Sequence, residues 1–429
     1  MKRGFGTIMA AQFFSSLADN ALFVVAVELL RSSGTPEWQH AALVPMFALF
    51  YVLLAPWVGA YADSRPKGRV MLLSNTIKIV GCMLMLVSVN PLLAYAVVGL
   101  GAAAYSPAKY GILTELLAPA QLVKANGWME GLTIASIILG VLLGGQLVAP
   151  HWLGWLHDLG LPGLDWVLRT PAQAAIATLV LVYGLAAVFN LGIPRTSARL
   201  RRLPRRAMWL LLPDFVRCNR RLWTDRLGQI SLATTTLFWG VSGNMRYIVL
   251  AWAAVALGYG TTDAAALVGV VALGTAVGAA LASMRVRLER ATVVIPLGVA
   301  MGGLLIAMVW VRHLWVAVPL LVVLGALGGY IVVPMNALLQ HRGHQLMGAG
   351  RSIAVQNFNE QACILGMGVF YSAATGLGLS ALGAVALFGA VVVGAMALIW
   401  GWHGHNVRHH GADVARLLAE ARSERAESL

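Results

Sequence analysis

The sequence predicts an all-α polytopic membrane protein of twelve transmembrane helices, and three observations lead to that prediction. Of the 429 residues, 59% are hydrophobic and only 11% are charged, whereas a soluble globular chain has roughly 25% charged residues. Apolar runs such as 379–402 reach the length of about 20 residues that a bilayer-spanning helix needs. Polar residues gather between these runs. A β-barrel would instead alternate polar and apolar residues over short segments, so the pattern excludes it.

The basic residues set the predicted orientation. With 31 Lys and Arg against 17 Asp and Glu, the formal net charge is +14, which raises the question of a nucleic-acid partner. The basic residues lie mostly at the N-terminus, in the even-numbered loops and in the tail, whereas the odd-numbered loops hold Arg31, Arg169 and Arg312. This is the positive-inside pattern of a membrane protein. We therefore predict that both termini are cytoplasmic, and we expect no nucleic-acid partner.

Each predicted span is an apolar run flanked by polar residues. The first run follows Lys2 and Arg3, as in a signal peptide, but it is long, contains Asp19 and lacks a small-residue cleavage site, so we predict an uncleaved helix. The 46 glycines lie mostly within the runs, as expected where helices pack closely in lipid. The predicted spans are 8–31, 41–62, 70–89, 92–114, 128–149, 172–192, 228–256, 264–284, 292–311, 314–338, 350–374 and 380–402.

The longest basic stretch, 195–226, separates six runs from six. We therefore predict an N-terminal six-helix half at 1–193, a cytoplasmic linker at 194–227 and a C-terminal six-helix half at 228–402. The linker is expected to lie on anionic headgroups, and the alternative is a solvated orientation signal without a ligand. The tail at 403–429 is charged and helix-prone with apolar residues on one side, which predicts a cytoplasmic amphipathic helix.

A weak internal repeat supports the two halves. Residues 107–113 of the fourth span read Pro-Ala-Lys-Tyr-Gly-Ile-Leu, and residues 334–339 of the tenth read Pro-Met-Asn-Ala-Leu-Leu. Internal repeats of this kind are typical of transporters. At the same offset Asn20, beside Asp19, falls near Arg246. We expect an acid on the first helix and a base on the seventh at equivalent depths.

Ionised side chains inside spans are the candidate pathway residues, because each costs about 2.5 to 3.5 kcal/mol at a helix centre. Asp19 and Asn20 lie about halfway along the first span, with a structural helix contact as the alternative. Lys109 follows Pro107 in the fourth span, and proline can bend a helix. Arg246 lies in a short polar segment within the seventh span. Its guanidinium suits a carboxylate or phosphate, so it would bind substrate, pair with Asp19, or do both in competition.

The eleventh span is unusually polar for a buried helix. Gln356, Asn357 and Glu360 lie on it, and the first and last share one face at i, i+4. We expect this face to meet water on the substrate path, with hydrogen bonding between helices as the alternative. Glu130 is expected to cap the start of the fifth helix, where an acid is favourable. Lys78 is expected to be structural.

The loop after the second span has the composition of a cytoplasmic gating loop. Gly59 would permit close helix approach, and Asp63 would accept hydrogen bonds from helix-end amides and nearby basic groups. Lys67 and Arg69 are basic, and Gly68 between them would permit a tight turn before the third span.

This loop resembles the cytoplasmic signature of the major facilitator superfamily, Gly-x-x-x-Asp followed by a basic Gly-Arg turn. Ser64 stands where the superfamily usually has a basic residue, and two extra residues precede the Gly-Arg pair. The resemblance implies the superfamily fold of two six-helix halves.

No pattern indicates catalysis, a metal site or a cofactor. Cys82, Cys218 and Cys363 lie far apart, and the histidines at 403–410 are loosely spaced. The sequence contains no Walker glycine-rich motif and no plausible serine-nucleophile motif. We therefore predict that the chain is not an enzyme and that ATP does not drive it directly.

Several strings together resemble the bacterial lysophospholipid transporter family. They also add Asn336 and Gln340 to the expected pathway residues. His341 stands where that family usually has an acid, and 152–169 looks like an insertion relative to it. The strings cover spans one to eleven and are 18–22, 62–64, 67–71, 99–113, 122–127, 237–240, 333–340 and 354–357.

The resemblance implies that the protein flips lysophospholipids, chiefly lysophosphatidylethanolamine, from the outer to the inner leaflet of the bacterial inner membrane for reacylation. It also implies a cytoplasmic acyltransferase and acyl-carrier-protein synthetase as partner. Arg246 or Lys109 would hold the phosphate, and Asp19 or Glu360 the ethanolammonium, since opposite charges suit a zwitterion. The alternatives are a proton-coupled drug or solute exporter, with Asp19 or Glu360 carrying the proton, and a membrane scaffold that does not transport.

Overall fold

The structure is a computed structural model that describes residues 4–35, 37–158, 168–196, 198, 200–201 and 208–426. Every regular element among these residues is helical, which confirms the predicted all-α class. Part of the predicted 152–169 insertion, residues 159–167, lies outside the described residues, as do the linker residues 202–207.

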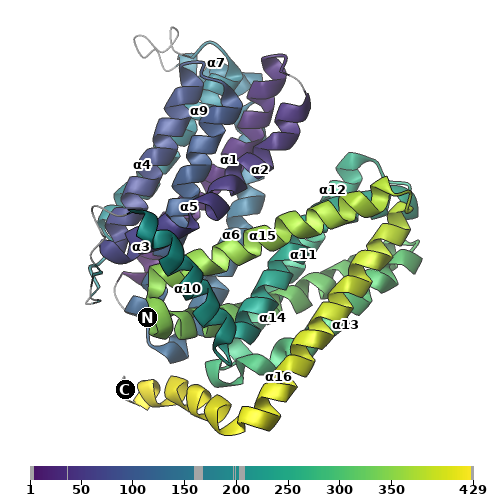
Figure 1. Cartoon of the computed structure of the whole chain (residues 1–429). Helices are drawn as coiled ribbons and strands as arrows, with labels where there is room; N and C mark the ends of the chain where they lie inside the picture. Colours follow the sequence, from purple (N-terminus) through teal and green to yellow (C-terminus); the bar gives the residue numbers. More distant parts are fainter. Residues whose placement is uncertain are drawn as a thin grey trace. The chain divides into compact units, whose positions relative to one another are not determined.

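The described helices occur in the following order along the chain (Figure 1). They are α1 (Phe5–Ser32), α2 (Glu37–Leu53), α3 (Ala55–Ser64), α4 (Lys67–Leu86), α5 (Pro91–Leu116), α6 (Pro119–Leu147), α7 (Pro150–Asp158), α9 (Pro171–Leu191), η1 (Met208–Leu210), α10 (Leu211–Thr224), α11 (Gly228–Ala256), α12 (Thr261–Arg285), η2 (Leu288–Val294), α13 (Ile295–Ala307), η3 (Met308–Trp310), α14 (Leu314–Met347), α15 (Ala349–Gly376) and α16 (Ala381–Ala426).

Nine helices of the described part are long and apolar enough to cross a bilayer, or ten if α2 and α3 count as one broken span. These two meet at a bend of 63°, where Pro56 lies in the first turn of α3 and has no N–H to continue the preceding helix. The span predicted at 41–62 is therefore broken at this bend. Helices α11 and α15 have 29 and 28 residues but are too polar to be among the nine. The count of twelve spans stays a prediction.

Helix α6 begins earlier than the sequence pattern indicated. We predicted a span from 128, but the helix starts at Pro119, a residue whose fixed φ suits the first helical position. The polar residues Gln121, Lys124 and Asn126, which we assigned to a loop, form its first turns. Glu130 consequently lies well inside the helix, and the expected capping role for it is wrong.

Contacts divide the chain into two compact units. Unit 1 comprises residues 1–116, 132–215 and 349–354, and unit 2 comprises 117–131, 216–348 and 355–429. Helices α6 and α15 therefore each contribute one part to each unit. The predicted division into two halves, a linker and a tail stays a prediction.

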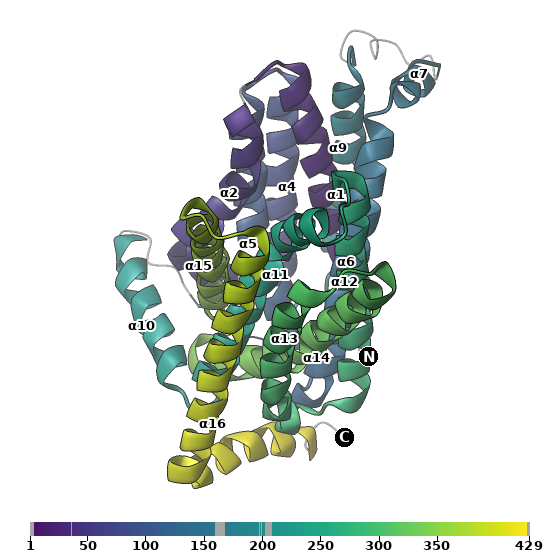
Figure 2. The ribbon, with the colours of Figure 1, turned by 90° about the vertical axis from the view of Figure 1, so that its right-hand side faces the viewer.

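In unit 1, α4 packs against α5 and α9, α1 against α9, and α2 against α5 (Figures 1 and 2). The core of this bundle is apolar and includes Leu22 and Val25 of α1, Val98 of α5, and Ile176 and Leu179 of α9. This packing brings α1, α4 and α9 together around the polar residues described below.

In unit 2, α12 packs against α14, and α13 against α16 (Figure 2). A Cβ atom on Gly278 of α12 would overlap the backbone of Ala326 in α14, and one on Gly325 of α14 would overlap Val271 in α12. Glycine is required at both positions because the two backbones are in contact. This confirms that the glycines within the runs mark helix contacts, as expected in lipid.

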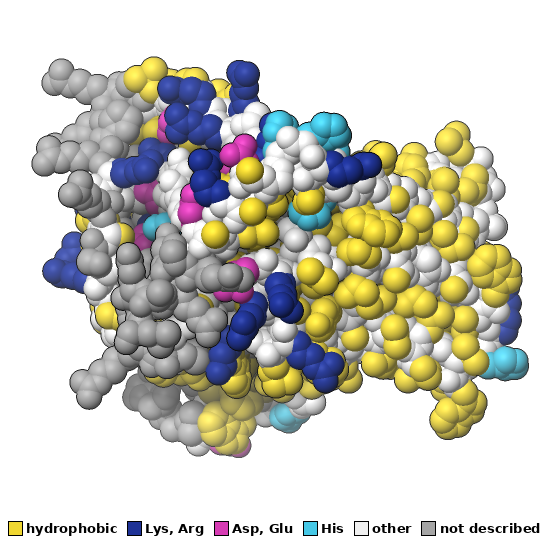
Figure 3. All heavy atoms as spheres, turned by 90° about the horizontal axis from the view of Figure 1, so that it is seen from below, with side chains coloured by type: hydrophobic (Ala, Val, Ile, Leu, Met, Phe, Trp, Pro, Cys, Tyr) yellow, Lys and Arg dark blue, Asp and Glu magenta, His cyan; other side chains and the backbone are white. Residues whose placement is uncertain are grey.

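Two helical segments lie outside these bundles: α10, which was not predicted as a helix, and the tail, which was. Helix α10 lies in the predicted linker and buries Cys218 and Leu222 while it exposes Arg220 and Arg221. Helix α16 continues to Ala426 and changes direction at His410, whose φ of −137° and ψ of 35° are not helical. The tail is thus helical, as predicted. Figure 3 shows a face on which Lys and Arg side chains gather on one part and hydrophobic side chains cover another.

Candidate functional site

Asp19 lies in a polar cluster between α1, α4 and α9. Lys78 Nζ is 2.7 Å from Asp19 Oδ2, and the Tyr183 hydroxyl donates to Asp19 Oδ1 at 2.7 Å. Lys78 also donates to the Ser15 hydroxyl at 3.0 Å, and Ser15 donates to Asn75 at 2.8 Å. Lys78 is 1% exposed, whereas the Asp19 side chain is 20% exposed. The cluster is therefore a buried ion pair with one accessible edge.

The sequence did not indicate Lys78 as the partner of Asp19. The two residues are 59 positions apart, and only the packing of α1 and α4 brings them together. The signal available was that both are ionised inside spans, which costs free energy unless they are paired. Asn20 donates to the Ser16 carbonyl of its own helix at 2.8 Å. Pairing of Asp19 with Arg246 stays a prediction, because the two residues belong to different units.

Lys109 lies on α5, two residues after Pro107, which is inside the helix. Its ammonium is 4.2 Å from the centre of the Tyr110 ring, a distance at which a cation is attracted to the ring face. The side chain is half-buried. A role for Lys109 in the pathway stays a prediction.

Three of the predicted pathway residues form one hydrogen-bonded cluster in unit 2. Gln356 Nε2 donates to Asn336 Oδ1 at 3.0 Å and to Glu360 Oε1 at 2.7 Å. Glu360 is 8% exposed. The i, i+4 pairing on α15 is therefore confirmed, and α14 supplies the third member through Asn336. Asn357 is half-buried, and its role stays a prediction.

Gln340 pairs with a residue that we had assigned to a loop. Its amide exchanges two hydrogen bonds of 2.9 Å with Asn126 of α6, and both side chains are buried. This pair joins α14 to the first part of α6 within unit 2.

We expect a double-mutant cycle of Asn126→Ala and Gln340→Ala to give a coupling free energy of about 0.6 to 1.7 kcal/mol, as for hydrogen bonds between membrane helices. Unfolding by detergent titration in mixed micelles measures it. A cycle of Asn126→Ala with Asn406→Ala is the control, since Asn406 bonds instead to the Arg226 carbonyl, and it should show no coupling. Equal couplings in the two cycles would contradict a direct pair.

Arg246 lies well inside α11 and is exposed. Its guanidinium has no hydrogen bond or ion pair with another described residue. Two residues earlier, Asn244 donates to the Ile364 carbonyl of α15 at 3.0 Å, so α11 and α15 are in contact next to this cation. A cation inside a predicted span, without a partner among the described residues, requires water or a ligand.

Asp63 anchors the start of α15 within unit 1. Its carboxylate accepts from the Gly350 N–H at 2.6 Å and the Arg351 N–H at 3.1 Å. It also lies 3.2 Å from Lys67 Nζ, which in turn lies 3.0 Å from Glu115. Acceptance from helix-end amides and basic groups, predicted for Asp63, is confirmed. Arg351 extends this network to Asp214 of α10, with Nε donating at 3.0 Å.

The two glycines of the predicted gating loop have different roles. A Cβ on Gly59 would lie 2.6 Å from Ala354 Cβ, so the expected close approach is confirmed between α3 and α15. Gly68 does not form a tight turn, because it lies in the first turn of α4 without a positive φ. A Cβ there would lie 3.1 Å from both the Asn190 carbonyl and Ile193. Gly68 therefore allows a close approach of α4 to the end of α9, where a larger side chain would be a tight fit.

A further ion-pair network in unit 2 was missed. Arg342 binds Asp225 through two contacts, at 2.7 and 3.2 Å, and reaches Glu420 of the tail at 3.4 Å. Asp225 also accepts from the Leu227 and Gly228 N–H groups at the start of α11. The network ties together α11, α14 and α16, three elements that are far apart in the sequence.

Apolar spans with buried polar clusters inside them define an all-helical, multi-pass membrane transporter. A family model described as "Major Facilitator Superfamily" matches residues 8–367, and the chain belongs to this superfamily. It is 40% identical over 405 residues to the lysophospholipid transporter LplT of Klebsiella pneumoniae, and the matched region covers 93% of this chain and 96% of that protein. It is also 40% identical over 379 residues to LplT of Yersinia pestis, with 88% of each chain covered. Both resemblances noted in the sequence are therefore confirmed.

Solved structures agree on the fold. The human organic anion transporter MFSD10 has a TM-score of 0.69 at 15% identity and covers 92% of this chain and 99% of its own. A bacterial homologue of the iron transporter ferroportin has a TM-score of 0.67 at 16% identity, covering 94% and 98%. At these identities the structures show the superfamily fold alone.

Proposed function

We propose that this protein flips lysophospholipids, chiefly lysophosphatidylethanolamine, from the outer to the inner leaflet of the bacterial inner membrane by alternating access. The 40% identity to transporters named for lysophospholipids supports the substrate class. In this proposal the chain has twelve spans in two six-helix halves with both termini in the cytoplasm. The transported lipid is then reacylated by a cytoplasmic acyltransferase and acyl-carrier-protein synthetase.

The observation that carries the proposal is the unpartnered Arg246 inside α11. A guanidinium binds phosphate through two parallel hydrogen bonds, and lysophospholipids bear one phosphate. Helices α11 and α15 are both long enough to span but too polar to face lipid all round, so they suit the wall of a hydrated path. Glu360, on α15, supplies a carboxylate for the ethanolammonium.

In this proposal, Arg246 and Glu360 are two successive binding positions along the path beside α11 and α15. Gly240 of α11 contacts Cys363, and Gly368 of α15 contacts Asn244, so the two helices run in the same direction. Arg246 then lies roughly nine residues further along than Glu360, or about 14 Å at 1.5 Å per residue. In the predicted orientation, Arg246 is nearer the outer leaflet. A headgroup entering from that leaflet would meet Arg246 first and the Glu360 cluster second.

Uptake of labelled lysophosphatidylethanolamine into spheroplasts of a transporter-deficient strain tests the function. We expect Arg246→Gln to lower uptake by about tenfold to a hundredfold, the effect of losing one charge-assisted hydrogen-bonded contact. Its thermal unfolding midpoint should not change, because Arg246 is exposed and unpartnered. The matched control is Arg312→Gln, an exposed arginine after η3, which should retain uptake.

A protonophore added to the same assay separates the proposal from its alternative. The buried Glu360 would suit a proton carrier, so a proton-coupled exporter on this fold remains the second candidate. Uptake that persists without a proton gradient supports facilitated lipid flipping. Normal uptake by Arg246→Gln at matched expression, or no uptake by the unmodified chain, would refute the proposal.

A further inference from the structure

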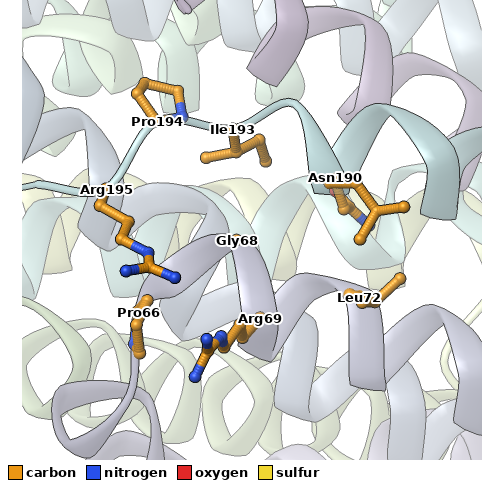
Figure 4. A pocket seen from close by; sticks show the side chains of 9 residues that line it. Pro66, Gly68, Arg69, Leu72, Asn190, Ile193, Pro194 and Arg195 are labelled. Carbon is orange, nitrogen blue, oxygen red and sulfur yellow. The ribbon is translucent and has the colours of Figure 1, made fainter.

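Two adjoining cavities lie where α4 begins and α9 ends, within unit 1. The first has a volume of about 210 Å³ and is lined by the first turn of α4, the last turn of α9 and the segment that follows α9. The second has a volume of about 410 Å³. Both are lined by Pro66, Arg69 and Arg195, and Figure 4 shows the side chains of the first cavity. Gly68 and Arg69 belong to the predicted gating loop, and none of the lining residues was predicted in the substrate pathway.

The cavities have the electrostatics of an anion site. Arg69 and Arg195 are exposed, and neither guanidinium has a hydrogen bond or ion pair with another described residue. Arg65 adds a third guanidinium to the second cavity. The N-terminus of α4 contributes a partial positive charge at the same place. No Asp or Glu is among the described residues that line either cavity.

Asn190 supplies an independent indication of a ligand. It lines the first cavity and is 2% exposed, yet neither its amide oxygen nor its amide nitrogen has a hydrogen-bond partner among the described residues. A buried polar group without a partner is costly to the fold. Its N–H₂ group would donate to a phosphate oxygen, and its carbonyl oxygen would accept from a hydroxyl group. One unpaired donor beside one unpaired acceptor fits a phosphate that carries a hydroxylated substituent.

The surroundings of the first cavity indicate that the phosphate belongs to a lipid. Leu181, Leu185, Val188 and Leu191 are spaced on one face of α9 and are 74%, 42%, 63% and 69% exposed. Such a face on a membrane span contacts acyl chains. Leu191 ends this face and also lines the cavity. A lipid whose headgroup occupied the cavity would lay its acyl chains along α9.

We propose that the cavity formed by Arg69, Arg195, Asn190 and the start of α4 binds the phosphate of an anionic phospholipid with a glycerol-type headgroup. The bound lipid is a resident of the membrane rather than the transported lipid. A zwitterionic headgroup fits less well, because its ammonium would find no carboxylate among the lining residues and would face the arginines.

Native mass spectrometry of the purified full chain in detergent tests the site. The probes are dioleoylphosphatidylglycerol, dioleoylphosphatidylethanolamine and dioleoylglycerol, with inorganic phosphate as competitor. We expect one phosphatidylglycerol molecule to bind more tightly than either other lipid. Arg195→Gln and Asn190→Leu should each weaken this binding by about tenfold, the loss of one charge-assisted or buried hydrogen-bonded contact. The matched control Arg290→Gln, an exposed arginine of η2, should bind as the unmodified chain does.

Three outcomes would overturn the proposal. Equal binding by Arg195→Gln and Arg290→Gln would exclude the site, and Arg195 is exposed, so its variant should fold even where Asn190→Leu does not. Equal binding of phosphatidylethanolamine and phosphatidylglycerol would exclude an anionic headgroup. Displacement of the lipid by inorganic phosphate at equal concentration would assign the site to a free anion. The assay measures no transport, so its result is independent of the proposed function.

Discussion

Replacement of Asp63 by alanine is expected to lower the free energy of unfolding by about 3 to 5 kcal/mol, the loss of two hydrogen bonds from backbone N–H groups to a charged acceptor. The variant leaves Lys67, which is 4% exposed, with Glu115 as its remaining acid. It also leaves the Gly350 and Arg351 N–H groups at the start of α15 without their acceptor. We expect uptake of lysophosphatidylethanolamine to be lost as well, because α15 carries Gln356 and Glu360.

Two further variants separate the charge of Asp63 from its general contribution to packing. Asp63→Asn keeps an oxygen that accepts from the Gly350 N–H, so we expect a smaller loss than for alanine. Asp214→Ala removes the other acid that binds Arg351, but that side chain is 35% exposed, so a loss of only about 0 to 1 kcal/mol is expected. Detergent-titration unfolding of the three variants ranks them. Equal losses for Asp63→Ala and Asp214→Ala would show that Asp63 does not anchor α15.

The sequence predicted the helices well because the bilayer restricts what a spanning segment can be. A span must satisfy its backbone hydrogen bonds internally, so an apolar run of sufficient length becomes a helix almost regardless of its other residues. The seventh predicted span, 228–256, coincides with α11 (Gly228–Ala256). Errors occurred at polar helix ends, as at Gln121 to Asn126, where water allows either a loop or a helix.

The partners of the candidate residues could not be predicted from the sequence in the same way. Asp63 was assigned its role because a short acid beside basic residues accepts from helix ends, a local argument that does not depend on packing. By contrast, the Asp225 and Arg342 pair requires α11 to lie beside α14, and nothing near either residue indicates the other. The tight turn predicted at Gly68 was wrong. A glycine in a polar loop suggests a turn, whereas this glycine lies in a helix and packs against Ile193, which is far away in the sequence.

Variants of the Asp19 and Lys78 ion pair allow an effect on stability to be distinguished from an effect on transport. Asp19→Asn leaves Lys78, 1% exposed, without a counter-charge, so we expect a loss of about 3 to 5 kcal/mol in the free energy of unfolding. Adding Lys78→Met removes the unpaired positive charge. The amide oxygen introduced by Asp19→Asn still accepts a hydrogen bond from the Tyr183 hydroxyl. Because charge-free replacements of buried pairs are often neutral or stabilising, the double variant should regain most of the lost stability.

Transport by the same double variant decides whether the pair is only structural. If Asp19 contributes to the pathway through its accessible edge, Asp19→Asn with Lys78→Met should be stable yet take up lysophosphatidylethanolamine about tenfold more slowly, the effect of one lost charge-assisted contact. The matched control is Asn75→Ala, which removes the hydrogen-bond acceptor of Ser15 in the same cluster and leaves both charges in place. Full uptake by the stable double variant would assign the pair to folding alone, because the substrate would then need neither charge.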